Sequence, residues 1–182
     1  DIPVAFAYLP ANFRIMAKAT LFHIPFLGWH LRRSGHMPIA RDNPRRAARS
    51  LLEAATHVRG GTSVFVFPEG GRSPDGHFKE FKAGTFLLAI KAGVPVIPVG
   101  IYLPRERTLR ITSGISGKET TANWYLRGPY SVTVGQPMKF EGNAEDREQV
   151  RGVTLSIMER IRALAQESEQ RLLRRRRFPS LA

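Results

Sequence analysis

Apolar residues recur at helical spacing between Asn43 and Gly61. Asn43 is a residue type that caps helices, and Pro44 suits the first helical position because an N–H there has no partner within the helix. We expect the helix to end at Gly60 and Gly61, since glycine is common just after a helix. Its apolar positions are Ala47, Ala48, Leu51, Leu52, Ala55 and Val58.

Three shorter stretches and the C-terminal region are also predicted to be helical. A first helix near the N-terminus is expected to end at Pro10, because proline breaks helices. Short helices are expected over residues 26–33 and 81–92, the second closing at Gly93. A long helix is expected from about Ala144, and its apolar stripe consists of Val150, Val153, Ile157, Ile161 and Leu164.

Short apolar runs that are rich in β-branched and aromatic residues predict strands between these helices. Phe13–Lys18, Ser63–Phe67 and Tyr130–Val134 are three such runs. Val94–Leu103 is a fourth, and its two prolines make it irregular or place it at a sheet edge. Helices that alternate with buried strands are typical of an α/β fold. We therefore predict a mostly parallel central sheet flanked by helices, with a long C-terminal helix.

Positive charge is the clearest feature of the composition. The 182 residues include 28 Lys and Arg against 15 Asp and Glu, which gives a formal net charge of +13. Arginine, the commoner cation, matches phosphate and carboxylate groups, so we expect an anionic partner: a nucleic acid, an acidic membrane surface or a phosphorylated substrate. A coding bias towards arginine is the alternative. Residues 141–182 hold nine basic and seven acidic side chains, so the excess lies mainly before them.

Several kinds of site are excluded by the sequence. It has no cysteine, which excludes disulfides, thiolate metal sites and cysteine nucleophiles. It has no G-x-x-x-x-G-K-[ST] loop, no G-x-G-x-x-G after a strand and no G-x-S-x-G turn. Its five histidines lack paired metal-ligand spacing. No run of about 20 apolar residues is present, so we expect no membrane-spanning segment within this sequence.

A glycine-rich loop, Phe67–Ser73 (FPEGGRS), directly follows one of the predicted strands. Ligands of open α/β sheets bind beyond the carboxyl ends of the strands. Gly70 and Gly71 would let backbone N–H groups approach an anion closely. Arg72 is suited to clamp a phosphate, and Glu69 to accept a hydrogen bond from a hydroxyl. The alternative is a solvated loop with ordinary turn chemistry.

Lys82 opens the next predicted helix, shortly after this loop. The N-terminal end of a helix favours anions, and the lysine adds a full positive charge. The alternative is a solvated lysine in the first turn. The loop and Lys82 together predict an anion site.

The order of these motifs resembles the glycerophospholipid acyltransferase family, in particular the 1-acyl-sn-glycerol-3-phosphate acyltransferases. The family's third block, F-P-E-G-T-R-S, is matched by Phe67–Ser73 with Gly71 in place of threonine, and its fourth, V-P-x-x-P, by Val94–Pro98. The second block resembles residues 17–41, where Ala40 stands in the place usually taken by aspartate. The resemblance predicts an acyltransferase domain over residues 1–140, followed by a C-terminal helix and basic tail over residues 141–182.

The family's first block is N-H-x-x-x-x-D, and the sequence begins with its aspartate, Asp1. The resemblance implies that the histidine lies five positions upstream of Asp1. We therefore expect the sequence to be N-terminally truncated and inactive by itself. In the family the histidine takes a proton from the acceptor's hydroxyl, whose oxygen attacks an acyl thioester, and the aspartate orients the imidazole. Asp1 is thus the expected catalytic residue.

The reaction that the resemblance implies is acyl transfer from acyl-CoA or acyl carrier protein to lysophosphatidic acid, which forms phosphatidic acid in phospholipid biosynthesis. It requires no metal or redox cofactor. The four cations among the implied substrate-binding residues would neutralise the phosphate of the acceptor. The implied substrate-binding residues are Lys18, Arg41, Pro68, Glu69, Gly70, Gly71, Arg72 and Lys82.

The apolar N-terminal third and the positive charge predict association with an anionic membrane surface, at its cytoplasmic face. Trp29 and the neighbouring phenylalanines, flanked by Arg32 and Arg33, fit a membrane interface, although many of them are also expected to pack in the core.

Two other functions stay open. A non-catalytic lipid-binding relative would explain the missing histidine and Ala40. A basic nucleic-acid-binding domain is permitted by the charge, but the FPEGGRS and V-P-x-x-P motifs do not need it, so no nucleic acid is expected as partner.

Overall fold

The computed structural model describes residues 2–9, 12–40, 43–71, 78–104, 108–113, 120–125 and 127–177. At its centre three parallel strands form a sheet in the order β2–β1–β3. Strand β1 is Phe13–Lys18, β2 is Met37–Ile39 and β3 is Ser63–Phe65. Because all three are parallel, their carboxyl ends lie at one edge of the sheet.

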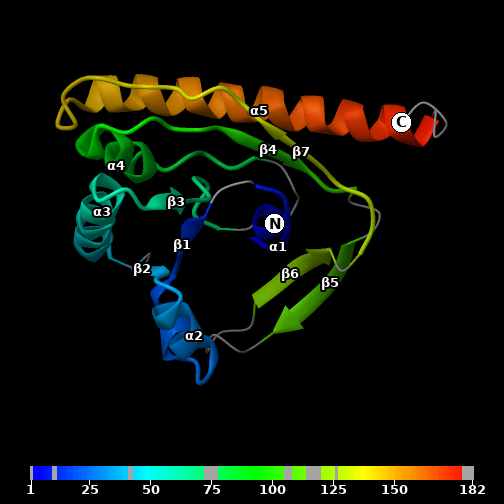
Figure 1. Cartoon of the computed structure of the whole chain (residues 1–182), viewed down its shortest axis with the longest axis horizontal. Helices are drawn as coiled ribbons and strands as arrows, with labels where there is room; N and C mark the ends of the chain where they lie inside the picture. The colour runs from blue at the N-terminus through cyan, green and yellow to red at the C-terminus, as the bar shows by residue number, and fades with distance from the viewer. Residues whose placement is uncertain are drawn as a thin grey trace.

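The two faces of β1 pack against different helices, because side chains alternate along a strand. Phe13, Ile15 and Ala17 join a core with residues of three helices: α1 (Ile2–Tyr8), the short 3-10 helix η1 (Ala19–His23) and α2 (Leu27–Arg33). Met16 joins a second core, with α3 (Pro44–Arg59) and α4 (Gly84–Ala92). Helices therefore cover both faces of the parallel sheet, as predicted (Figure 1).

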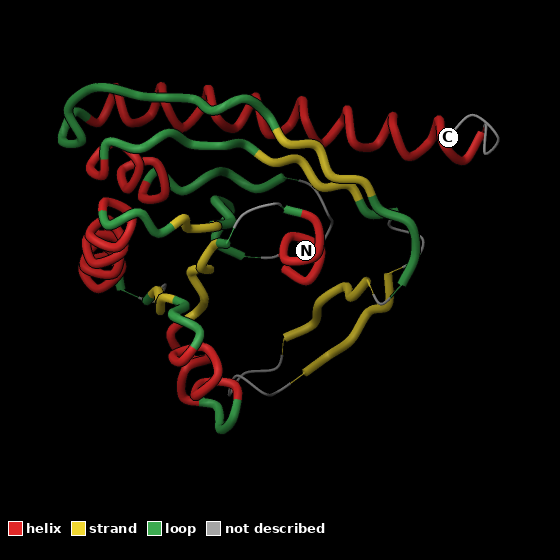
Figure 2. The backbone as a smooth tube through the Cα atoms, viewed as in Figure 1, coloured by secondary structure: helices red, strands yellow, loops and turns green. Residues whose placement is uncertain are grey.

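A second layer consists of two antiparallel strands and the C-terminal helix. Strand β4 (Val99–Tyr102) pairs with β7 (Ser131–Val134), and α5 (Arg147–Arg177) packs along both (Figure 2). A third core joins Phe81 and Phe86 to Ile157, which is completely buried. Strands β5 (Thr108–Ser113) and β6 (Thr120–Tyr125) form an antiparallel hairpin apart from this layer.

The helix predictions are confirmed, with shifts at some ends. Asn43 caps α3 with its side chain, whose oxygen accepts from the backbone N–H groups of Arg45 and Arg46. The predicted helix at 81–92 begins only at Gly84, and the long helix begins at Arg147 instead of about Ala144. The predicted apolar stripe of this helix, from Val150 to Leu164, faces the interior of the protein.

The strand predictions needed more correction. Ser63–Phe67 is a strand only as far as Phe65 and is half-buried rather than buried. Within Val94–Leu103 only β4 is a strand, and it pairs antiparallel with β7 outside the parallel sheet. The prolines account for the lost length, since Pro95 and Pro98 have no N–H to donate to a neighbouring strand. Strand β2 and the β5–β6 hairpin were not predicted.

Candidate functional site

The carboxyl ends of the three parallel strands bring predicted site segments together. Lys18 is the last residue of β1 and is exposed, and it lies opposite Ile39 at the end of β2. On the other side of β1, Phe13 pairs with Ser63 and Ile15 with Phe65, so β3 runs beside the first half of β1 and ends three residues before the level of Lys18. The chain leaves β3 towards Pro68 at the same edge at which Lys18 lies. This edge is where open α/β sheets bind ligands.

Backbone hydrogen bonds hold the glycine-rich loop at its base. Gly70 donates its N–H to the carbonyl of Phe67 at 3.0 Å, which turns the chain directly after Pro68. Where the chain returns, Lys82 donates its backbone N–H to the carbonyl of Pro68 at 2.9 Å. The carboxylate oxygen Oε2 of Glu69 accepts from the N–H of Lys79 at 3.0 Å. The two arms of the loop are thus tied together at two successive positions.

The side chain of Lys82 lies against Gly70. A Cβ atom placed on Gly70 would be 3.1 Å from Nζ of Lys82 and 2.8 Å from its Cε, and the second distance is closer than Cβ atoms approach other atoms in proteins. Gly70 also has a φ of 68°, which glycine adopts without strain. The absence of a side chain on Gly70 therefore leaves room for Lys82, whose ammonium group lies against the backbone of the loop. Gly71, by contrast, has open space where its Cβ would be.

The structure places five of the predicted substrate-binding residues in this loop and its return: Pro68, Glu69, Gly70, Gly71 and Lys82. Lys18 is exposed at the end of β1, the strand that lies beside β3. Asp1, Arg41 and Arg72 lie outside the described residues, so their predicted roles stay predictions. Glu69 was predicted to hold a hydroxyl, and the structure shows its carboxylate on the backbone of Lys79.

Two contacts that support the loop were not predicted from the sequence. The guanidinium carbon of Arg162, on α5, lies 5.9 Å from the ring centre of Phe78, next to the returning arm of the loop. Phe81 is buried and its ring is 6.4 Å from that of Phe86. Helix α5 therefore supports the segment that carries Lys82. No sequence signal identified the contact of Arg162 with Phe78, because these residues are about 80 positions apart.

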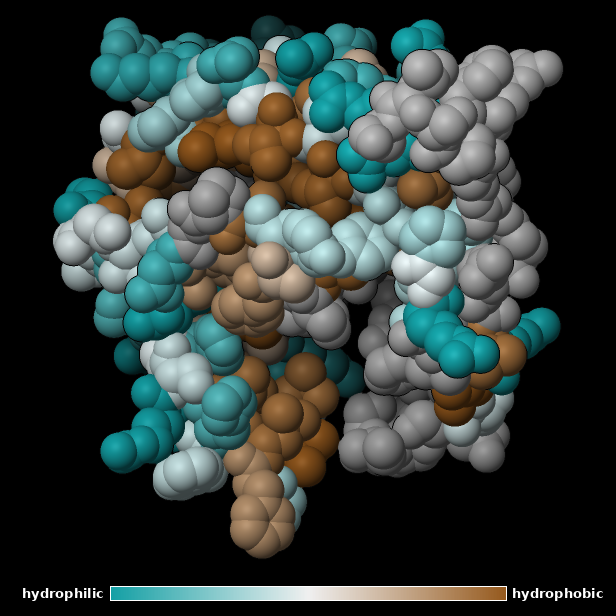
Figure 3. All heavy atoms as spheres, turned by 45° about the vertical axis from the view of Figure 1, so that its right-hand side comes forward, coloured by the Kyte–Doolittle hydropathy of each residue, from teal (hydrophilic) through white to brown (hydrophobic). Residues whose placement is uncertain are grey.

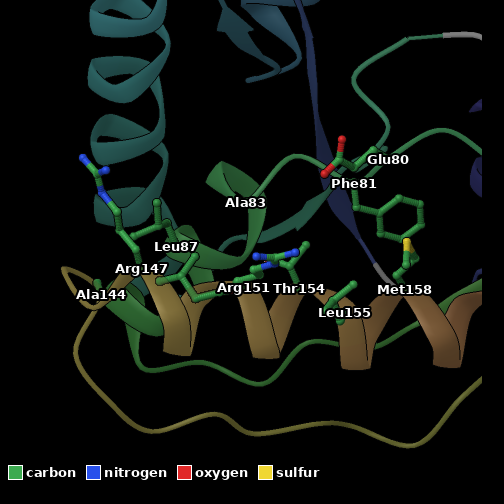
Figure 4. Close-up of a pocket in the computed structure, with 11 residues that line it drawn as sticks. Glu80, Phe81, Ala83, Leu87, Ala144, Arg147, Arg151, Thr154, Leu155 and Met158 are labelled. Carbon is green, nitrogen blue, oxygen red and sulfur yellow. The ribbon is translucent and has the colours of Figure 1, made fainter.

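A cavity of about 370 Å³ lies between the start of α4 and the first turns of α5. Its lining is mostly apolar, with Arg147 and Arg151 contributed by α5 (Figure 4). Phe81 and Ala83 line it, whereas Lys82 between them lies against Gly70. The cavity and the predicted anion site are thus on different sides of one segment.

His36 has a lowered pKa, and it lies beside the middle of β1, at Ile15. Burial is the main cause, followed by the positive charge of Arg14 and the neighbouring His30. Its Nδ1 accepts a hydrogen bond from the N–H of Ile15 at 3.3 Å, a contact that requires this nitrogen to be unprotonated. His36 therefore connects the start of β2 to β1 as a neutral group.

Among the described residues, no cluster of histidine and acidic side chains suited to a metal ion is found. Within that same part of the chain, no helix is long and apolar enough to cross a bilayer.

The sequence model of the family described as Acyltransferase matches residues 1–102. The chain belongs to this acyltransferase family. The match includes β1, η1, α2 and the glycine-rich loop, and it ends with β4. The family resemblance inferred from the four blocks is confirmed.

Individual acyltransferases agree with this assignment. The chain is 41% identical over 91 residues to the chloroplastic 1-acyl-sn-glycerol-3-phosphate acyltransferase BAT2 of Brassica napus, covering 50% of this chain and 26% of that protein. It is 36% identical over 131 residues to the 1-acyl-sn-glycerol-3-phosphate acyltransferase of Pseudomonas aeruginosa, covering 69% and 45% respectively. The chain thus matches less than half the length of either relative.

A solved structure confirms the fold. The crystal structure of the 1-acyl-sn-glycerophosphate (LPA) acyltransferase PlsC from Thermotoga maritima superimposes with a TM-score of 0.60 at 26% identity. The superposition covers 93% of this chain and 61% of that one, so nearly all of the described architecture is shared.

Proposed function

We propose that this acyltransferase transfers an acyl group from a thioester donor to the free hydroxyl of lysophosphatidic acid, forming phosphatidic acid. The observation that carries the proposal is the position of Lys82, whose ammonium group lies on Gly70 where the chain leaves the parallel sheet. A phosphate bound there would meet a full positive charge beside Gly71, which is exposed. The relatives in Brassica napus and Pseudomonas aeruginosa are both named for this acceptor.

The acceptor's phosphate would lie between Lys82 and Lys18, since Lys18 ends β1 and Lys82 lies against the loop that follows β3, the neighbouring strand. Phosphate is held well by several cations, because each contact is charge-assisted. Arg41 and Arg72 follow β2 and Gly71 in the sequence, so they are the further cations in this proposal. Neutralising the phosphate would let the lipid's hydroxyl approach the thioester with less electrostatic repulsion.

The chemical step follows the family's first block. A histidine five positions before Asp1 would take the proton of the acceptor's hydroxyl as its oxygen attacks the thioester carbonyl. Asp1 would orient the imidazole and stabilise its cation. The donor's sulfur leaves as a thiol, and no protein nucleophile, metal or redox cofactor takes part. Acyl-CoA and acyl carrier protein both supply this chemistry.

The proposal is tested with a protein that also carries the histidine of the first block upstream of Asp1, by measuring the phosphatidic acid that it forms from lysophosphatidic acid with each donor. We expect Lys82→Met to raise the KM for the acceptor about tenfold or more, and the KM for the donor little, because a charge-assisted hydrogen bond contributes about 1.5–3 kcal/mol. Arg72→Ala should act in the same direction. Lys91→Met is the matched control, since Lys91 is exposed on α4 at the end away from Gly84.

Failure of the protein that carries this histidine to form phosphatidic acid from either donor would overturn the proposed reaction. Equal loss of affinity for acceptor and donor in Lys82→Met would instead contradict the phosphate-binding role alone. A protein that binds lysophosphatidic acid without turnover would point to the lipid-binding alternative.

A further inference from the structure

The turn that precedes α2 exposes large apolar side chains to solvent. Phe26 is 89% exposed, Trp29 is 64% exposed and Leu27 is 41% exposed. We call residues 25–29 the prong. Figure 3 shows apolar side chains at the foot of the molecule, where Figure 1 draws α2, with one ring standing clear of the surface. Neighbouring exposed apolar groups of this size mark an interaction site more often than isolated ones do.

The backbone conformation that holds Phe26 in this exposed position is strained. Phe26 has φ 61° and ψ −52°, and it is the one non-glycine residue with positive φ in the described part of the chain. Leu27 donates its N–H to the carbonyl of Pro25 at 2.6 Å, which completes a γ-turn of the rare, strained kind. Such strain persists only where the surrounding structure imposes it.

Gly28 shows what imposes the strain. A Cβ atom at this position would collide with the backbone carbonyl of Phe22, so the start of α2 packs directly on η1. Phe22 and Leu31 are buried on either side of the prong and anchor it to the core below β1. The prong is thus a rigid projection, with apolar groups outside and a firm base.

The charges around the prong identify its partner. Residues 2–40 contain no aspartate or glutamate, and they contain Arg14, Lys18, Arg32 and Arg33. Arg32 and Arg33 are exposed in the last turn of α2, and the guanidinium of Arg33 lies 5.9 Å from the ring centre of Trp29. Exposed aromatic side chains next to cations, in a stretch of sequence without acidic residues, complement a bilayer that carries anionic headgroups.

We propose that the prong inserts into the headgroup region of an anionic bilayer, with Phe26, Leu27 and Trp29 reaching the acyl boundary and Arg32 and Arg33 among the headgroups. The 3-10 helix η1 joins the prong directly to Lys18, so docking would hold the carboxyl edge of the sheet at the membrane. A lysophospholipid acceptor would then reach Lys18 without leaving the interface. Only this last step rests on the proposed function, because docking itself needs no turnover.

Flotation with vesicles tests the proposal. The protein is mixed with phosphatidylcholine vesicles with and without phosphatidylglycerol, in the absence of acyl donor. We expect Phe26→Gly combined with Trp29→Ser to lower partitioning onto the anionic vesicles about tenfold or more, because the buried apolar area drives insertion. Glycine keeps the turn, since it adopts positive φ freely. The matched control, Leu52→Ser with Leu173→Ser, removes two apolar side chains that are each 50% exposed on α3 and α5.

The depth of insertion is tested with the prong intact. The chain has two tryptophans, so Trp124→Phe leaves Trp29 as the only one. We expect its emission to shift to shorter wavelength on anionic vesicles and to be quenched by brominated lipid. Arg32→Ala and Arg33→Ala should each lower binding about fivefold on anionic vesicles and much less on neutral ones.

Three results would overturn the proposal. The first is a prong variant that is folded by circular dichroism and floats as well as the parent protein. The second is Trp29 emission that is neither shifted nor quenched in the vesicle-bound protein. The third is an equal loss of binding in the Leu52 and Leu173 control. Inactivity towards lysophosphatidic acid would leave these readouts unchanged, so the two proposals fail separately.

Discussion

The carboxylate of Glu69 accepts a hydrogen bond from the backbone N–H of Lys79 at 3.0 Å and thereby closes the base of the glycine-rich loop. The bond spans ten residues and lies beside the one between Pro68 and Lys82. Glu69, the glutamate of the third sequence block, therefore has a structural role in this chain. It fixes the distance between the two arms of the loop, and Lys82 is on the returning arm.

Removing this carboxylate should loosen the return of the loop. We expect Glu69→Ala to speed hydrogen exchange at the Lys79 amide and to raise the KM for the acceptor, at a cost of about 1 kcal/mol because the bond is partly solvated. Glu69→Gln is the control, since its amide oxygen can accept the same hydrogen bond. Exchange at Lys79 that is equally slow in all three proteins would show that the bond does not hold the loop.

Gly70 and Gly71 are neighbours that should respond oppositely to a side chain. Gly70→Ala should lower the melting temperature, because a non-glycine residue at positive φ costs about 1–2 kcal/mol and its Cβ would displace the Lys82 side chain. Gly71→Thr, which restores the residue usual in the family, should leave stability nearly unchanged because its Cβ meets open space. Thermal unfolding of the two variants checks this, and equal melting temperatures would contradict it.

Two of the three strands of the parallel sheet could be predicted because their signals are local. The Asn43-Pro44 helix start and the apolar run of β1 each lie within a few residues, and both elements formed where expected. Strand β2 was missed because its three residues, which include Pro38, are too few to show an alternation of apolar and polar side chains. The hairpin was missed because the alternation of apolar and polar residues in β5 does not mark a buried face. Leu109 in this strand, for example, is 53% exposed.

The candidate site was only partly predictable for a related reason. The glycines, Glu69 and Lys82 were identified from the FPEGGRS block and the helix that follows it. The partner of Glu69 was not, because a backbone N–H has no sequence signature. Helix α5 was predicted as a helix, but the contact of Arg162 with Phe78 depends on how α5 packs in three dimensions.

Gly100 should be among the positions least tolerant of substitution. A Cβ there would collide with the backbone of α5 at Leu164 and Ala165. We expect Gly100→Ala to destabilise the protein by about 3 kcal/mol, since neither backbone can move without disturbing β4 or the helix. Gly152→Ala is the contrasting control: nothing lies near its Cβ, so it should stabilise α5 by up to about 1 kcal/mol. Denaturant unfolding of both variants checks the two signs, and a Gly100→Ala protein as stable as its parent would show that β4 and α5 are not in direct contact.

His36 should make the stability of the fold depend on pH. Burial and the charge of Arg14 lower its pKa from the ordinary value of 6.5, so the folded protein binds this proton less readily than the unfolded chain does. Stability is therefore greatest above pH 6.5 and should be lost as the pH falls from there towards the folded-state pKa of His36. His36→Asn keeps an acceptor for the Ile15 N–H and does not titrate, so it should flatten this dependence. Urea unfolding across this range tests the slope, and an NMR titration of the His36 ring tests its cause. A midpoint at or above 6.5 would rule out a half-buried neutral imidazole between β1 and β2.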